Sequence, residues 1–494
     1  MFRFSRCGGL LLVGIGVLAA GSQPVVAQLG TYHNYAQTTA ALQDFATAYP
    51  NLLEVGTLGQ SGLGKEIWYA RIANNLAAEE DEPEFRYIST MHGDEVVGVE
   101  MSLYFIDHLL SNYGGTDQVG QRITDLVDST DITIVPLMNP DGRDLGRRYN
   151  ANWVDLNRAF PEGSHTNIGN VLDGPPMDLA GREPEVQAVM EWSAANRFTL
   201  SANFHGGALL VNYPYDNDGL GDTYSAAPDD DLFIEISRSY SRHNEPMWNS
   251  PRFEDGITNG AEWYSIDGGL QDWAYRYLGD NHVTIELSDN KWPSESLLPT
   301  FWDDNRESML SFAEQVHIGV RGLMSDAVTG QPIEGVVEVL GNERTVFSDP
   351  DVGDYHRMLL PGTYDLRFTA AGYESVTVEE VIVTDGVATR LDILMPSISA
   401  LDEADFDLDG DVDGDDFLLW QSSFGTSSLG DADGDGDADG DDFLVWQTQF
   451  GNASGGAGTA IPEPASLAML ASLALALSSM GRRSQFKWTP VLNR

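Results

Sequence analysis

The chain has almost no cysteine, because Cys7 is the only one among 494 residues. It precedes the apolar run 10–20, and residues 1–27 show the basic start, apolar centre and small-residue end of a secretory signal peptide. The exported chain is therefore expected to contain no cysteine, which excludes a disulfide framework. For an exported protein of this size, packing and bound metal ions must then supply the stability.

Basic residues are also scarce. Lysine and arginine total 27 against 76 aspartate and glutamate residues, which gives a formal net charge of -49. Such a chain repels phosphate groups, so nucleic acid is excluded as a partner and an anionic membrane surface is disfavoured. A cationic substrate or bound divalent cations are expected instead.

The length predicts about three domains. Residues 28–317 alternate apolar strand-like runs with helical stretches, which predicts an α/β domain with a mixed, largely parallel sheet and helices on both faces. The expected strands are 85–90, 131–137, 198–204 and 282–287, and the expected helices are 96–110, 183–195, 230–243 and 299–316. Functional sites of such sheets lie beyond the strand ends.

Candidate metal ligands stand at two of these strand ends. His92 and Glu95 follow the first strand, with Glu95 expected to open an amphipathic helix, and His205 ends a later strand. Two histidines and a carboxylate form a common catalytic zinc set. The spacing of His92 and Glu95 alone is more often that of a helix start whose carboxylate faces the helix dipole.

Polar groups suited to a carboxylate substrate follow. Arg148, Asn157 and Arg158 lie in the stretch 146–161, and guanidinium groups bind carboxylates through two parallel hydrogen bonds. Glu286 lies within an apolar strand, where a carboxylate is costly to bury without a partner. These residues indicate a hydrolytic metal site, although either arginine alone could be a surface residue.

At this point a family resemblance is evident. The motifs HGDE, NPDG, the block from Arg148 to Arg158, FHGG, NYPYD, TNGAEWY, GGLQD and TIEL occur in this order. Residues 28–317 thereby resemble metallocarboxypeptidases of family M14, most closely the N/E-type subfamily. No catalytic position of the family pattern is replaced. The main departure is the lack of cysteines, so no disulfide holds the segment between Gln271 and Glu286.

The resemblance implies a role for each motif residue in a zinc-dependent peptide hydrolase acting on peptide or protein C-termini. One zinc ion would be held by His92, Glu95 and His205; Glu286 would be the general base and Arg148 the oxyanion donor; Asn157, Arg158 and Tyr264 would grip the terminal carboxylate; and Asp216 and Gln271 would line the pocket for the last side chain. The acid in that pocket suggests a preference for C-terminal lysine or arginine.

Two alternative functions stay open at this stage. The first is a related carboxypeptidase acting on peptidoglycan stem peptides, which also end in a free carboxylate and can carry diamino acids. The second is a catalytically silent surface binding module, against which the intact ligands, base and carboxylate-binding residues argue.

Residues 318–397 change character to short alternating strands separated by turn pairs. This pattern predicts a small all-β sandwich. It resembles the transthyretin-like, carboxypeptidase regulatory-like domain that follows the catalytic domain in the same subfamily. We expect it to be a structural or docking module, because it carries no constellation of catalytic groups.

Residues 401–452 contain an acidic repeat of two loops with phase-locked aromatic residues. Oxygen ligands at loop positions 1, 3, 5, 9 and 12 are typical of a calcium loop. The expected ligands of two structural calcium ions are Asp405, Asp407, Asp409, Asp413 and Asp416 in the first loop, and Asp431, Asp433, Asp435, Asp439 and Asp442 in the second. The final Asp and the short following helix resemble a small α dockerin module, which implies a cohesin-like partner.

The C-terminal segment combines a linker at 453–460 with a motif at 461–484. Pro462, Glu463 and Pro464 precede an apolar stretch and a basic pair, and that stretch is short for a permanent membrane span. This order resembles the PEP-CTERM sorting signal of Gram-negative bacteria. The resemblance implies export, transient membrane contact, and placement at the cell surface or in the extracellular matrix.

Overall fold

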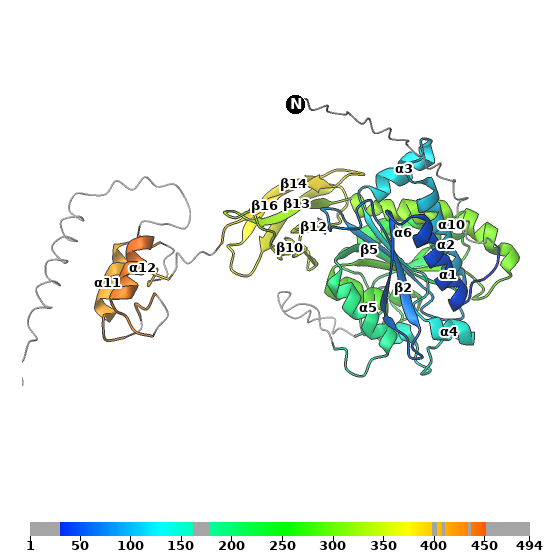
Figure 1. Ribbon diagram of the computed structural model, residues 1–494, viewed down its shortest axis with the longest axis horizontal. Coiled ribbons are helices and arrows are strands. Elements are labelled where there is room, and N and C mark those ends of the chain that lie inside the picture. Colours follow the sequence, from blue (N-terminus) through cyan, green and yellow to red (C-terminus); the bar gives the residue numbers. More distant parts are fainter. Residues whose placement is uncertain are drawn as a thin grey trace, which may run out of the picture. The chain divides into compact units, whose positions relative to one another are not determined.

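The computed structural model describes residues 30–161, 178–397, 403–407, 411–427, 429–432 and 436–450. It divides into two compact units, one reaching Ser397 and the other beginning at Ile398 (Figure 1). The predicted signal peptide 1–27, linker 453–460 and sorting segment 461–484 lie outside the described residues. Among the described helices, none is long and apolar enough to cross a membrane.

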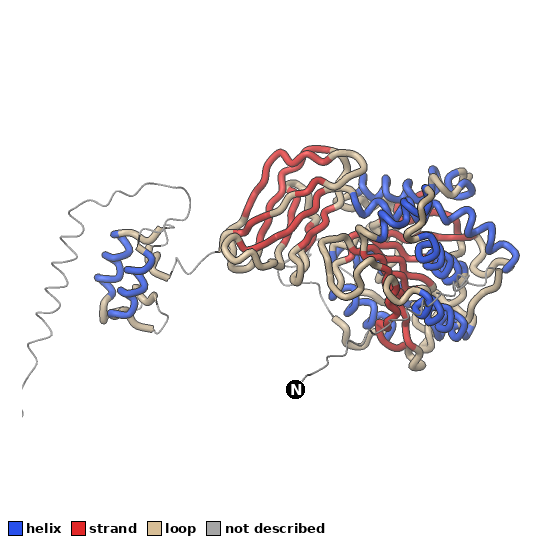
Figure 2. The backbone as a smooth tube through the Cα atoms, turned by 45° about the horizontal axis from the view of Figure 1, so that its top comes forward, coloured by secondary structure: helices blue, strands red, loops and turns tan. Residues whose placement is uncertain are grey.

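An eight-stranded mixed sheet forms the centre of the first unit (Figures 1 and 2). In spatial order its strands are β1 (Leu53–Gln60), β2 (Glu66–Ile72), β4 (Asp131–Val135), β3 (Glu84–Ser89), β5 (Phe198–His205), β8 (Asn281–Ser288), β6 (Ala208–Tyr213) and β7 (Ile257–Asn259). The central strands β4, β3, β5 and β8 are parallel, whereas β2 and β6 join them antiparallel. The predicted mixed α/β architecture is therefore confirmed.

Helices cover both faces of this sheet. Their bounds are α1 (Tyr35–Ala48), α2 (Val97–Asn112), α3 (Gln118–Val127), α4 (Pro140–Leu145), α5 (Pro184–Ala195), α6 (Asp230–Ser241), α7 (Glu245–Trp248), α8 (Gly260–Trp263), α9 (Leu270–Leu278) and α10 (Leu298–Glu314). One apolar core joins α1, α2, α3, α6 and α10 to the sheet, and a second joins α5 and α9. Strand residues alternate between these cores, as Tyr87 and Ile88 do in β3.

Helix α2 differs from the expectation in two ways. It begins at Val97, so Glu95 lies in the turn before the helix and does not open it. The helix is also buried almost all round rather than amphipathic, because it is enclosed between the sheet and other helices. Its buried Glu100 is paired with His33, whose Nδ1 lies 2.8 Å from Oε2. This partner explains how a carboxylate is tolerated there.

The β-sandwich follows within the same unit. Its strands are β9 (Val320–Asp326), β10 (Val336–Val339), β11 (Thr345–Phe347), β12 (Asp354–Arg357), β13 (Gly362–Thr369), β14 (Val376–Val383), β15 (Thr389–Arg390) and β16 (Ile393–Met395). The order β11-β10-β13-β14 forms one sheet, and β12, β15 and β16 pair with β9. Residues 389–395 thus contribute two short strands, both parallel to β9.

The described part of the second unit contains two short helices, α11 (Gly414–Ser423) and α12 (Gly440–Gln449). Both start with an Asp capping box, formed by Asp413 with Asp416 and by Asp439 with Asp442. The indoles cross between the repeats, with Trp420 Nε1 donating to the Asp439 carbonyl at 2.9 Å and Trp446 Nε1 to the Asp413 carbonyl at 3.0 Å. The repeated aromatics therefore hold the two halves together.

Candidate active site

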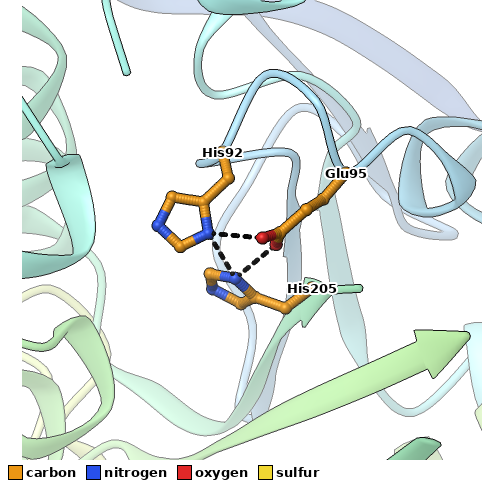
Figure 3. Close-up of side chains that lie close together, drawn as sticks. All are labelled: His92, Glu95 and His205. Atoms are coloured by element: carbon orange, nitrogen blue, oxygen red, sulfur yellow. Dashed lines mark hydrogen bonds and ion pairs between the residues drawn. The ribbon is translucent and has the colours of Figure 1, made fainter. Parts of the chain in front are cut away.

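The three predicted metal ligands converge on one point, although His205 is far from the others in sequence (Figure 3). His92 Nδ1 lies 3.0 Å from Glu95 Oε1 and 3.0 Å from His205 Nδ1, and His205 Nδ1 lies 2.8 Å from Glu95 Oε2. His92 and Glu95 come from the loop between β3 and α2, while His205 ends β5. All three side chains are buried.

The protonation of this cluster suits a cation. His92 Nε2 lies 2.9 Å from Asp155 Oδ1, and a proton on that nitrogen leaves the Nδ1 lone pair facing the cluster. Burial lowers the pKa of His205 to about 4, so its imidazole is neutral at pH 7. Burial opposes ionisation of Glu95, but the two imidazoles hold its pKa well below the ordinary value.

This donor set fits a zinc ion. Tetrahedral zinc with bonds of about 2.0–2.1 Å places its donor atoms about 3.3 Å apart, close to the separations found between these nitrogen and oxygen atoms. Two imidazole Nδ1 atoms and one carboxylate also match the ligand types that zinc prefers. The three ligands leave room for a fourth position, because they border an open pocket.

Glu286 faces the same pocket from the neighbouring strand. It is the register partner of His205 in the parallel pair of β5 and β8, so both side chains leave the sheet at one level. Its Oε2 atom is buried without a hydrogen-bond partner among the described residues. Burial raises the pKa of Glu286 well above its ordinary value, and the nearby Glu95 raises it further. Glu286 is thus a carboxylate suited to accept a proton.

Two cations lie beside Glu95. Arg148 Nη1 is 3.2 Å and Lys291 Nζ is 2.7 Å from Glu95 Oε1. The Nε of Arg148 also donates to Asp155 Oδ2 at 2.9 Å, so Asp155 holds both His92 and the guanidinium. Burial opposes ionisation of Asp155, but these two neighbours lower its pKa below the ordinary value.

The pocket beside the cluster has a volume of about 170 Å³. Its lining includes Arg148, Asn157, Arg158 and Tyr264, the residues to which the family resemblance assigns substrate contacts. Asn157 Oδ1 accepts the Leu270 N–H at 3.1 Å, which fixes the orientation of this amide, and its N–H groups can donate to a ligand. The 42% exposed Tyr264 side chain borders solvent. The pocket therefore presents hydrogen-bond donors near the cluster.

Asp216 lies in the same pocket and is almost completely buried. Its Oδ1 accepts from Gln271 Nε2 at 2.9 Å and from Asn212 Nδ2 at 3.2 Å. Burial raises the pKa of Asp216 well above its ordinary value, and the adjacent Asp272 raises it further. Gln271 is not among the residues that line the pocket, and its contribution is the hydrogen bond that it donates to the Asp216 carboxylate.

Several site residues were not predicted from the sequence. Asp155 lies inside the recognised block 146–161, but nothing in that stretch indicates that its carboxylate bridges His92 and Arg148. Lys291 follows β8 by three residues and could have been suspected from its position after Glu286. Asp272, whose carboxylate accepts the Asp216 backbone N–H at 2.9 Å, follows Gln271 directly.

Part of the predicted calcium ligand set is described. Potential ligand atoms of Asp405, Asp407 and Asp416 lie within 4.8 Å of one another, as do those of Asp411, Asp413 and Asp416. Asp411 was not among the predicted ligands. The predicted ligands Asp409, Asp433 and Asp435 lie outside the described residues. Asp431, Asp439 and Asp442 belong to the second loop and the start of α12.

Comparison with protein families gives two matches. The family model of zinc carboxypeptidases matches residues 38–308, which contain the whole candidate site. The model of the carboxypeptidase regulatory-like domain matches residues 319–396, which form the β-sandwich.

Individual relatives agree with these matches. The chain is 39% identical over 384 residues to human carboxypeptidase D, covering 74% of this chain and 27% of that protein. It is 40% identical over 365 residues to carboxypeptidase SOL1 of Arabidopsis thaliana, covering 73% of this chain and 71% of the relative. The human carboxypeptidase N catalytic chain is 36% identical over 389 residues, covering 72% and 83%. The match thus spans about a quarter of carboxypeptidase D, but most of the other two relatives. This chain therefore belongs to the zinc carboxypeptidase family.

Proposed function

We propose that this protein is an exported zinc metallocarboxypeptidase that hydrolyses the C-terminal peptide bond of substrates ending in lysine or arginine. The observation that carries the proposal is the shared pocket of the His92–Glu95–His205 cluster, Glu286 and Arg148. A metal donor set, a carboxylate base and a guanidinium around one cavity are the parts that metal-assisted hydrolysis needs.

The reaction divides among the chain's own residues. When bound, zinc polarises the scissile carbonyl and lowers the pKa of a neighbouring water molecule. Glu286 accepts the proton of the attacking water and delivers it to the leaving amine. Arg148, held by Asp155, donates to the oxygen on which negative charge develops. The cations Lys291 and Arg148, which both lie beside Glu95 Oε1, favour the ionised form of Glu95 that a metal ligand requires.

Exopeptidase action follows from the donors beside the cluster. Arg158, the amide group of Asn157 and the Tyr264 hydroxyl bind the free terminal carboxylate. Arg158 provides the charge, because a guanidinium forms two parallel bonds to a carboxylate. An amidated C-terminus has no such charge and would leave these donors without an anionic partner. The site therefore selects the last peptide bond.

Asp216 supports the preference for a basic last residue. Its buried carboxyl is costly to ionise alone, but a cationic side chain entering the pocket favours the charged form. The net charge of -49 also raises the encounter rate with cationic peptides. An amine-bearing diamino acid of a peptidoglycan stem peptide would suit Asp216 as well, so muropeptides are the second substrate class.

The remaining segments suggest where the enzyme acts. The signal at 1–27 and the sorting motif at 461–484 support export to the cell surface or extracellular matrix, with transient membrane contact. The acidic loops support two structural calcium ions and a cohesin-like partner, because potential ligand atoms of the first loop lie close together. These assignments concern placement and are independent of the chemistry at the zinc site.

A substrate panel tests the proposed activity. Zinc-loaded protein is incubated with three peptides that differ only in a C-terminal Lys, Leu or Glu, and with lysine-ending muropeptides. We expect release of one residue, fastest from the Lys peptide, and loss of that preference in Asp216→Ala. No release from any substrate would overturn the proposed activity. A Leu preference, or an undiminished Lys preference in Asp216→Ala, would overturn the specificity alone.

A further inference from the structure

The β-sandwich contacts the catalytic domain through a buried ion pair. Arg357, at the end of β12, donates from Nη2 to Asp229 Oδ1 at 2.7 Å, and Asn342 Nδ2 donates to the same oxygen at 2.8 Å. Arg357 is 1% exposed and Asp229 is 7% exposed. Arg357 Nη1 also donates to the Met358 carbonyl at 2.9 Å, whereas its Nε has no hydrogen-bond partner among the described residues. Removing one member of such a buried pair is costly, because the other charge is then left without its partner.

Asp229 also forms hydrogen bonds to Tyr275 of helix α9. Its Oδ2 accepts the hydroxyl of Tyr275 at 2.9 Å, and its backbone N–H donates to the same hydroxyl oxygen at 3.2 Å. The Arg344 guanidinium of the sandwich lies over the Tyr275 ring, 4.7 Å from its centroid. A Cβ at Gly279 would lie 2.8 Å from Arg344 Nη2, so this cation also lies against the C-terminal end of α9. The sandwich thus holds α9 at two points.

The other end of α9 holds Asp216. Gln271 donates to the Asp216 carboxylate, and Asp272 accepts the Asp216 backbone N–H. One turn further, the Arg276 guanidinium lies 4.5 Å from the centroid of the Tyr215 ring. Helix α9 therefore contacts the Asp216 segment through three of its residues.

From these contacts we infer that the β-sandwich positions the specificity pocket. Arg357, Arg344 and Asn342 act through Asp229 and Tyr275 on α9, and α9 fixes the carboxylate of Asp216. These are positioning residues, because none of them lines the pocket. The inference rests on the proposed function, since it concerns recognition of a basic last residue. Weakening the connection should impair Lys substrates and spare substrates that do not use Asp216.

Tyr275→Phe is the sharpest variant, because it removes only the hydroxyl that joins Asp229 to α9. Tyr240→Phe is the matched control, since Tyr240 is equally buried and its hydroxyl donates to Asn305 Oδ1 at 2.7 Å, outside this connection. The double variant Asp229→Asn/Arg357→Met removes both members of the ion pair together, so neither of these two is left as a charge without its partner. All variants are made in the full zinc-loaded chain.

The first readout is the ratio of kcat/KM for a Lys-ending peptide to that for a Leu-ending peptide. We expect Tyr275→Phe and the double variant to lower it about two- to thirtyfold, the range of energetic coupling seen for residues that contact no ligand. In these variants kcat/KM for the Leu-ending peptide should stay unchanged. In Tyr240→Phe the Lys-to-Leu ratio should equal that of the wild-type protein. If the contacts only stabilise the fold, the variants would lower kcat/KM for both peptides equally. An unchanged ratio therefore overturns the inference.

The second readout is hydrogen exchange of the α9 amides, which requires no activity. We expect faster exchange over 270–278 in Tyr275→Phe and the double variant, and wild-type exchange in Tyr240→Phe. Unchanged α9 exchange overturns the positioning role. If the wild-type protein cleaves no peptide, the proposed function fails, while the exchange data still decide whether the sandwich fixes α9.

Discussion

His205 and Glu286 are register partners on the adjacent parallel strands β5 and β8. This pairing fixes the distance between a candidate metal ligand and the proposed base through backbone hydrogen bonds rather than flexible loops. We predict that Glu286→Gln lowers kcat about 10²- to 10⁴-fold, the usual contribution of a general base. Zinc content should remain near one ion per chain by elemental analysis. Turnover close to wild type would remove Glu286 from the mechanism.

Asp155 should control metal affinity through His92. Asp155→Ala removes the acceptor that orients the imidazole, and such outer partners are worth about 10- to 100-fold in metal affinity. Competition with a chelator measures the zinc dissociation constant. Asp131→Ala is the matched control, because Asp131 also pairs with an arginine, Arg71, far from the cluster. Equal zinc affinity in the two variants would contradict the role of Asp155.

Substitutions of the two pocket arginines, Arg148 and Arg158, should affect different kinetic constants. Arg148→Met removes a donor to charge that develops in the transition state, so kcat should fall about 10²- to 10³-fold. Arg158→Met removes a charge-assisted bond to the substrate carboxylate, so KM should rise about 10- to 100-fold. Steady-state kinetics with a Lys-ending peptide measures both. The opposite assignment of kcat and KM effects would exchange the roles of the two residues.

His317 makes stability depend on pH. Burial lowers its pKa to about 4 in the folded protein, and its Nε2 lies 2.8 Å from Thr130 Oγ1. The unfolded chain therefore binds this proton at higher pH, and stability should fall as the pH drops from about 6.5 to 4. His317→Gln cannot take up the proton, so its denaturation midpoint should decline less over this window. Parallel midpoint curves for the two proteins would show that His317 does not contribute.

The acidic repeats should bind calcium independently of the zinc site. We expect calorimetry on the full chain to find two calcium ions, and Asp416→Ala to lose one of them because it removes the ligand at the last loop position. Asp415→Ala, which changes the neighbouring exposed acid, should keep both. Absence of calcium binding in the wild-type chain would leave the segment 401–452 as an acidic spacer.

Sequence motifs were sufficient to place the cluster residues, because His92 and Glu95 follow β3 in one loop and His205 ends the adjacent parallel strand β5. The location of Glu286 in an apolar strand already required a buried partner. The bridging role of Asp155 was not predictable, since it depends on a loop that folds back onto His92. Helix α2 was misjudged because amphipathic spacing does not reveal a helix covered on all sides. Strands β1 and β2 were not predicted, because antiparallel strands that are half exposed contain no long apolar run.

The most direct test of the account compares two peptides that are identical except at the C-terminus. One ends in lysine with a free carboxylate, and the other ends in lysine amide. Mass spectrometry after incubation with the zinc-loaded protein should show loss of the single terminal residue from the free peptide and no change in the amide. Equal cleavage of both peptides, internal cleavage, or no reaction with either would contradict a carboxylate-reading zinc exopeptidase.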